Sequence, residues 1–251
     1  RRNEQLADAA ERSAVIADWM GAVPYPKEAL NDAWKRFLWH QFHDDLTGTS
    51  IWEAYTYSWN DEFLAQGQFC DVILASAGAA ASVMDTRAQG SPVLVYNPAA
   101  YSRRSLVEAT VDLPAEAEGV AVYAPDGKTV PAQIVARDGA RATVLFAAAM
   151  EPVSYAVYDV RAGKAGKGKV LRASGNTLEN RVYKVTLDAN GDIASVIDKR
   201  NGRDLVEKGK AFRLAVLTPN VSNRYPAWEI HKATLDQTPE PVDTDVRISV
   251  A

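Results

Sequence analysis

The sequence predicts an α+β fold, in which a bundle of about three helices is followed by an antiparallel β-sandwich. Apolar residues recur at helical spacing through the first third of the 251 residues, whereas they alternate with polar residues in short segments after residue 90. The composition, with 47% hydrophobic and 24% charged residues, is typical of a soluble globular protein that can bury a core. We expect a helical domain over residues 1–88 and a β-sandwich domain over residues 89–251, with the junction between Asp85 and Pro92.

The first predicted helix covers about residues 4–20, where alanine and other apolar residues follow helical spacing. Gly21 offers a C-terminal stop, and the prolines at positions 24 and 26 then oppose continuation of the helix. A second helix is predicted from Lys27 to about Asp44. Leu30, Trp34, Phe37, Leu38 and Gln41 would form its face toward the bundle.

A third, long helix is predicted to begin near Ser50, because Glu53 stands three residues later, which is the spacing of a capping box. It would continue to about Met84. The alanines near its C-terminal end, together with Gly78, would allow close contact with a neighbouring helix.

Strand-like segments follow, after glycine and proline at positions 90 and 92 interrupt the helical pattern. The alternating segments cover residues 93–96, 105–113, 119–125, 142–148 and 153–160. A basic, glycine-rich segment at residues 161–169 is predicted to be a flexible loop. Residues 181–187 and 192–198 are predicted to form a hairpin, because Asn190-Gly191 between alternating segments is the strongest short-range hairpin signal.

Charge and cysteine content exclude several classes of function. The net charge is −4, so there is no basic surface for a nucleic acid and no polybasic membrane anchor. The alanine-rich run at residues 73–84 is too short to span a membrane. Cys70 is the one cysteine, so no internal disulfide forms, and a buried apolar role is expected rather than catalysis.

Both ends of the sequence indicate a piece of a longer protein. Arg1 opens directly into a helical pattern, and the last residues end within an alternating pattern, so the β-sandwich domain is expected to be incomplete. Neither a compartment nor an oligomeric state can be read, and a homo-oligomer is compatible with the sequence.

Two of the three histidines lie in the segment FLWHQFHDDLTGTS, residues 37–50, beside adjacent acids. On a helical wheel His43 falls about 180° from Trp34, so we expect His43 and Asp44 at a helix end, facing away from their own bundle. A structural role is the alternative, because a histidine in a last helical turn is favoured by the helix dipole alone.

His40 and His43 are three residues apart and could form one edge of a metal site. Zinc needs three or four ligands, and the third histidine, His231, lies in the predicted β region. A complete metal site within this chain is therefore not expected, whereas a site completed by another domain is compatible with the pattern.

Residues 33–50, AWKRFLWHQFHDDLTGTS, resemble the helix-and-loop motif of glycoside hydrolase family 38, the class II α-mannosidases. Phe42, where many members have histidine, is similar to the bacterial and cytosolic-type branch. Residues 93–104 and 178–205 resemble the strand leading into an Asn-Pro turn and the hairpin that opens the C-terminal β-domain. Residues 224–230, RYPAWEI, are a weaker match, with Pro226 and Glu229 in place of acids. The matching positions in the main motif are Ala33, Trp34, Lys35, Leu38, Gln41, Phe42, His43, Asp44, Gly48 and Thr49.

The resemblance implies a retaining α-mannosidase that hydrolyses terminal α-D-mannosides or oligosaccharides, of which this chain is the helical middle domain and the start of the C-terminal β-domain. His43 is then expected to be a ligand of one Zn²⁺ ion, and Asp44 to hydrogen-bond sugar hydroxyls. The nucleophile and the other zinc ligands would belong to an N-terminal catalytic domain, so no catalytic residue is expected here and the fragment alone should be inactive. His40 corresponds to a variable position, so its replacement is expected to matter little.

Two further expectations concern the surface. If a catalytic domain docks near His43, the apolar residues there, including Trp39, should be exposed. The alternative function is a non-catalytic module that binds carbohydrate or another protein, for which Trp52, Tyr101 and Trp228 could stack on sugars, although single aromatic residues more often serve packing.

Overall fold

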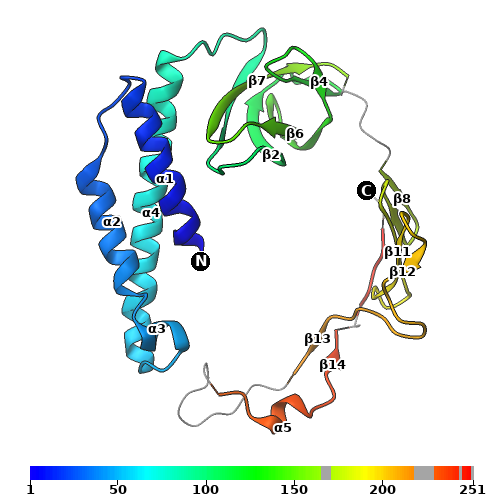
Figure 1. Ribbon diagram of the computed structural model, residues 1–251. Helices are drawn as coiled ribbons and strands as arrows, with labels where there is room; N and C mark the ends of the chain where they lie inside the picture. The colour runs from blue at the N-terminus through cyan, green and yellow to red at the C-terminus, as the bar shows by residue number, and fades with distance from the viewer. Residues whose placement is uncertain (165–170, 218–228, 243–244, 250–251) are drawn as a thin grey trace. The chain divides into compact units, whose positions relative to one another are not determined.

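The computed structural model describes residues 1–164, 171–217, 229–242 and 245–249. The chain divides into two compact units, Arg1–Lys167 and Gly168–Ala251. The last long helix ends at Val83 and the first strand begins at Ser91, which confirms the predicted change from helix to strand (Figure 1). The compact units divide later in the chain, so domains of residues 1–88 and 89–251 stay a prediction.

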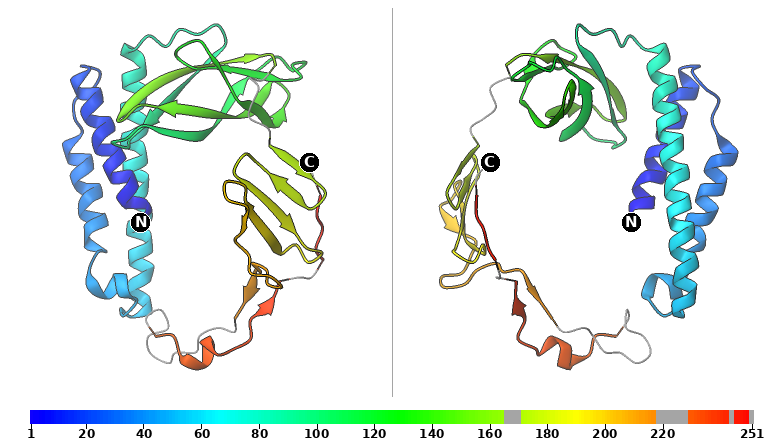
Figure 2. Two further views of the ribbon diagram at one scale, coloured as in Figure 1. Left: turned by 45° about the vertical axis from the view of Figure 1, so that its right-hand side comes forward. Right: turned by 180° about the vertical axis from the view of Figure 1, so that it is seen from behind.

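Three helices of the first unit pack into a bundle, with α1 (Arg2–Trp19) and α2 (Lys27–Trp39) lying along α4 (Trp52–Val83) (Figure 2). Buried alanines of α1 face the long helix, and small side chains allow the two helix axes to approach closely. The predicted end of the first helix is confirmed, with Gly21 in the left-handed region at φ +68°. The core of the bundle contains Ala7, Ala10, Ala14, Leu30, Ala33, Phe37, Ala65, Phe69 and Val72.

The predicted second helix is wrong at its C-terminal end, because α2 stops at Trp39 rather than near Asp44. A separate short helix, α3 (His43–Thr47), follows after a turn. The face of α2 that packs in the bundle also differs from the prediction, because Leu38 is exposed whereas Leu30 and Phe37 are buried.

The predicted cap of the third helix is also wrong. Helix α4 begins at Trp52, Ile51 is its N-cap, and no side chain caps it. The Ser50 hydroxyl instead donates to Asp45 Oδ1 over 2.9 Å, so a hydrogen bond to the preceding helix α3 replaces the capping box that the sequence indicates.

Two antiparallel sheets complete the first unit and confirm a β-sandwich. One sheet has the order β1-β7-β3-β4 and the other β2-β6-β5. A single hydrophobic core, with Val122, Tyr158 and Val160 from one sheet and Val144 and Phe146 from the other, lies between them. The strands are β1 (Ser91–Asn97), β2 (Arg103–Asp112), β3 (Val120–Tyr123), β4 (Thr129–Val130), β5 (Ala132–Asp138), β6 (Arg141–Met150) and β7 (Ser154–Ala162).

The bundle and the sandwich are joined by hydrogen bonds from α1. The Ser13 hydroxyl lies 2.7 Å from the Tyr155 hydroxyl of β7, and Tyr96 of β1 donates to the carbonyl oxygen of Ala9 over 3.2 Å. Ser13 is fully buried, so this junction is part of the interior of the unit.

The second unit contains a five-stranded antiparallel sheet of order β12-β11-β10-β9-β8. The predicted hairpin is confirmed as β10 (Tyr183–Leu187) paired with β11 (Ile193–Asp198), and Gly191 takes φ +78° in the turn. The other elements are β8 (Arg172–Ser174), β9 (Thr177–Glu179), β12 (Arg203–Asp204), β13 (Ala215–Val216), α5 (Lys232–Leu235) and β14 (Glu240–Pro241).

Two predictions fall at least partly outside the described residues. The glycine-rich segment 161–169 is described only as far as residue 164, and the RYPAWEI segment only at Glu229 and Ile230. Among the helices that the structure describes, none combines the length and the apolar character needed to cross a bilayer.

Candidate functional site

The candidate site lies where the chain leaves α2 and enters α3. His43 is the first residue of α3, and its side chain is 78% exposed, whereas that of Asp44 is 43% exposed. His43 Nε2 lies 3.5 Å from Asp44 Oδ2, so the structure brings the two predicted site residues together. The expected outward direction of His43 is confirmed, although it begins a new helix instead of ending the previous one.

Asp44 is held by the loop that follows α3. Thr49 donates from its hydroxyl to Asp44 Oδ1 over 2.6 Å and from its amide to the Asp44 carbonyl oxygen over 3.0 Å. The same carbonyl accepts the amide of Ser50 over 3.1 Å and the hydroxyl of Tyr55 over 3.1 Å. Gly48 at φ +78° provides the turn that returns the loop to Asp44. These contacts leave the second carboxylate oxygen facing His43.

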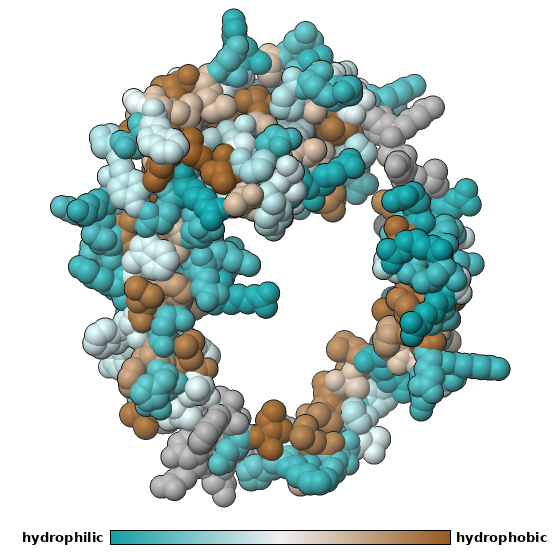
Figure 3. Space-filling view, in the orientation of Figure 1, coloured by the Kyte–Doolittle hydropathy of each residue, from teal (hydrophilic) through white to brown (hydrophobic). Residues whose placement is uncertain are grey.

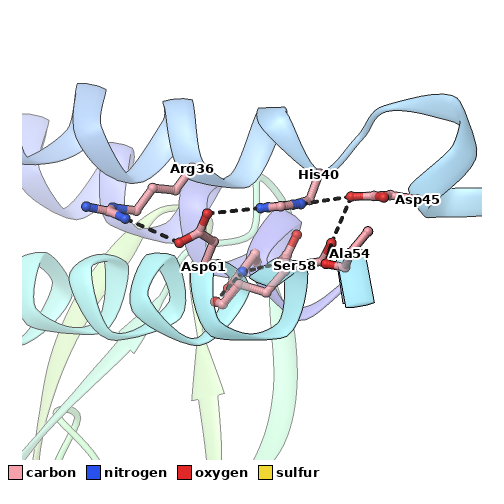
Figure 4. A network of polar contacts seen from close by, with 8 residues as sticks. Arg36, His40, Asp45, Ala54, Ser58 and Asp61 are labelled. Carbon is pink, nitrogen blue, oxygen red and sulfur yellow. Dashed lines mark hydrogen bonds and ion pairs between the residues drawn. The ribbon is translucent and has the colours of Figure 1, made fainter. Parts of the chain in front are cut away.

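His40 takes a different position from His43 and is buried between two carboxylates (Figure 4). Its Nδ1 lies 2.8 Å from Asp45 Oδ2 and its Nε2 lies 3.2 Å from Asp61 Oδ2, and Arg36 in turn contacts Asp61. A carboxylate only accepts, so both ring nitrogens must carry a proton to make both bonds. Burial by itself lowers the pKa of His40, but the bonds to Asp45 and Asp61 outweigh it and raise the pKa above its ordinary value.

Asp45 is the second member of this buried network. Its Oδ2 accepts hydrogen bonds from His40 and from Ser58, the latter over 2.9 Å, and its Oδ1 accepts from Ser50. Burial alone raises the pKa of the carboxyl group, but the hydrogen bonds from His40, Ser50 and Ser58 reverse this effect and lower the pKa.

The donor set fits part of a zinc site and not a whole one. Within the part of the chain that the structure describes, no three His, Cys, Asp or Glu side chains are placed to hold a metal ion. Both nitrogens of His40 are engaged, so the two-histidine edge considered from the sequence is wrong. His43 offers an exposed imidazole next to the carboxylate of Asp44, and both are donor types that zinc takes.

Exposed apolar side chains surround this end of the bundle, where Figure 3 shows brown surface near α3. Trp39 is 76% exposed, as expected, and Phe42, Leu46 and Trp52 are also exposed. The ring of Phe42 lies with its centroid 4.3 Å from that of His43. The site is therefore an exposed polar pair within an apolar surface.

Sequence reasoning missed the roles of His40 and Asp45. Asp45 directly follows the motif pair, and its role cannot be recognised without knowing that Ser58 of α4 and His40 lie beside it. The one signal in the sequence was the second acid of the His-Asp-Asp triplet, residues 43–45.

Comparisons with known proteins give structural matches. No protein-family model matches the sequence, and no curated protein does. An alpha-mannosidase from Enterococcus faecalis V583 is 22% identical and matches 90% of this chain and 29% of its own, with a TM-score of 0.68. A protein in the Glycosyl Hydrolase Family 38 from Enterococcus faecalis is 21% identical and matches 85% of this chain and 29% of its own, with a TM-score of 0.65. The chain therefore has the fold of a segment that makes up about 29% of each of these two proteins.

Proposed function

We propose that the chain is part of a zinc-dependent, retaining α-mannosidase that hydrolyses terminal α-D-mannosides. In this proposal His43 is one ligand of a single Zn²⁺ ion and Asp44 binds sugar hydroxyls. The observation that carries the proposal is the exposed His43–Asp44 pair, whose side chains lie 3.5 Å apart at the start of α3, in a chain with the fold of an alpha-mannosidase segment.

The residues of this chain would bind and orient the substrate. The exposed imidazole of His43 is free to turn one nitrogen toward a metal. Asp44 Oδ1 already accepts from Thr49, so the second oxygen is the one available to accept from a sugar hydroxyl. Zinc, when bound, would supply Lewis-acid polarisation of adjacent hydroxyl groups.

The groups that break the glycosidic bond would lie in another domain. Retention requires two carboxyl groups about 5 Å apart, one acting as nucleophile and the other as acid and base. We assign these, and the remaining zinc ligands, to an N-terminal catalytic domain of a longer protein, so the 251-residue chain alone should be inactive. The apolar surface of Trp39, Phe42 and Leu46 would face that domain, because such a surface is unfavourable in water.

A non-catalytic module that binds carbohydrate or protein is the second candidate. It is favoured by the exposed Trp52 and Tyr101, at 75% and 65%, and by the incomplete set of metal ligands among the described residues. Trp228, the third aromatic residue considered for this role, lies outside the described residues.

The deciding experiment is an assay of the full-length protein with an aryl α-mannoside, before and after removal of metal by a chelator. We expect turnover that is lost with the metal and restored by zinc, and little turnover of the matched aryl β-mannoside. A full-length protein that contains zinc but turns over neither substrate, and binds mannose oligosaccharides through the isolated chain, would favour the binding module.

A further inference from the structure

We propose that His40 and Asp45 are positioning residues, which fix the segment that carries His43 and Asp44 by tying it to α2 and α4. The role of His43 and Asp44 in binding zinc and sugar rests on the proposed function. The positioning of α3 by His40 and Asp45, which we call the tie, rests only on contacts within this chain.

Helix α3 is not held in place by buried apolar side chains. It is five residues long and none of them is buried, and Leu46, its one aliphatic residue, is 63% exposed. So short a helix is not stable by itself in water. Its position must therefore come from polar contacts.

Asp45 makes these polar contacts to three different segments. Its carboxylate accepts from His40 at the end of α2, from Ser58 within α4, and from Ser50 in the loop after α3. Asp45 is only 14% exposed, so these bonds are shielded from competition by water. The Asp45 side chain thus joins α3 to α2, to α4 and to the loop after α3, and Figure 4 shows its contacts with His40 and Ser58.

The charges of this network balance one another. Arg36, His40, Asp45 and Asp61 carry two positive and two negative charges when both nitrogens of His40 are protonated. Removing His40 would leave two carboxylates without their shared partner, and removing Asp45 would leave a buried cation with only Asp61. Either change should release α3.

Ser50 links the Asp45 network to Asp44. The hydroxyl of Ser50 donates to Asp45, while its amide donates to the Asp44 carbonyl oxygen. Loss of the first bond therefore weakens the second, and with it the loop that orients the Asp44 carboxylate.

Amide hydrogen exchange of the 251-residue chain tests this proposal without metal or substrate. In His40→Ala and Asp45→Ala the amides of Thr49 and Ser50 should exchange about tenfold faster or more, the equivalent of one lost buried hydrogen bond. The amide of Phe69 in the bundle core should change less. Ser13→Ala is the matched control, because it removes a buried hydroxyl far from the loop and should not accelerate Thr49 and Ser50 selectively.

Unchanged exchange at Thr49 and Ser50 in folded His40→Ala and Asp45→Ala, or acceleration only in parallel with Phe69, would overturn the proposal. If both variants fail to fold, Ser58→Ala decides, because it removes one bond to Asp45 and no charge. Faster amide exchange at Thr49 and Ser50 alone in Ser58→Ala supports the proposal. Unchanged exchange at these two amides rejects the proposal.

A second measurement separates positioning from mere stability. In the full-length protein, Asp45→Ala should weaken zinc binding about tenfold or more, as loss of an outer contact to a ligand does, whereas Ser13→Ala should not. Loosened amides with unchanged zinc affinity would reject the positioning role. If His43→Ala keeps its zinc, the proposed function is rejected instead. The hydrogen-exchange result still tests whether His40 and Asp45 position α3.

Discussion

His40 and His43 are separated by only two residues, yet the side chain of His40 is 7% exposed and that of His43 is 78% exposed. The cause is the break after Trp39, where the amides of Gln41 and Phe42 bond back to the last turn of α2 and Phe42 then takes a non-helical conformation, with φ −56° and ψ 139°. One imidazole is thereby directed into the bundle and the other into solvent. This difference separates a structural histidine from a candidate metal ligand.

The first prediction is that the two histidines differ in their effect on stability. His40→Ala should lower the free energy of unfolding by about 3 kcal/mol, because it removes a buried imidazole and leaves the carboxylates of Asp45 and Asp61 without their shared partner. His43→Ala should change it by less than about 0.5 kcal/mol, as expected for an exposed side chain. Urea denaturation of the 251-residue chain measures both. Equal changes in the free energy of unfolding for the two variants would contradict the difference in burial between His40 and His43.

The second prediction concerns pH. The pKa of His40 is raised in the folded state by Asp45 and Asp61, so its contribution to stability is fully present below its unfolded pKa, about 6.5. The contribution is lost as pH rises through the higher folded pKa. The native chain should therefore lose stability relative to His40→Gln, which lacks this titration, as the pH rises above about 6.5. Parallel stability curves for the two proteins would show that His40 is not an imidazolium in the folded state.

The sequence predicted the elements whose signals are local. Gly21 ends the first helix, Asn190-Gly191 forms the hairpin turn, and the alternating segments became strands of the sandwich, because each depends on neighbouring residues alone. The break of the second helix was missed, since residues 40–42 follow a helical pattern that tertiary contacts of His40 override. The short β8 and β9 and the strand β5 were missed because their polar residues give weak alternation.

The site could be predicted only in part, and for a physical reason. His43 and Asp44 came from a resemblance to a motif, and the helical wheel placed His43 away from the bundle for a helix that in fact ends before it. His40 was assigned little importance, whereas the structure places it in a network with Asp61, which lies 21 residues away in sequence. Contacts of this range are set by how α2 packs on α4, which periodicity does not encode.

The third prediction tests the close packing of α1 on α4. Ala10 is fully buried between the helices, so Ala10→Leu should overpack the core and cost about 1–3 kcal/mol. Ala75→Leu, at an exposed position of α4, is the matched control and should be close to neutral. Thermal or urea unfolding distinguishes the two variants. An Ala10→Leu variant as stable as the native chain would mean that α1 and α4 are not closely packed at Ala10.

The fourth prediction concerns Asn97, which ends β1 in the Asn-Pro turn of the motif. Its side chain is buried, donates to the carbonyl oxygens of Tyr101 and Glu151 over 3.1 and 2.7 Å, and accepts the amide of Ala99. Asn97→Ala should lower the free energy of unfolding by about 2–3 kcal/mol, because it removes a buried side chain that makes three hydrogen bonds to the backbone. Asn60→Ala, at an exposed position, is the control. Equally small changes in the free energy of unfolding for Asn97→Ala and Asn60→Ala would show that the turn does not need the side-chain amide of Asn97.

The central claim is that His43 supplies a zinc ligand to an α-mannosidase, and zinc content tests it most directly. The measurement is metal stoichiometry and aryl α-mannoside turnover of the full-length protein, for His43→Ala beside His231→Ala, which removes an imidazole from the second unit. We predict that His43→Ala loses most of its zinc and at least about 99% of its turnover, since one of about four ligands is removed, while His231→Ala keeps both. Retention of zinc and turnover by His43→Ala, or equal losses in the two variants, would contradict the account.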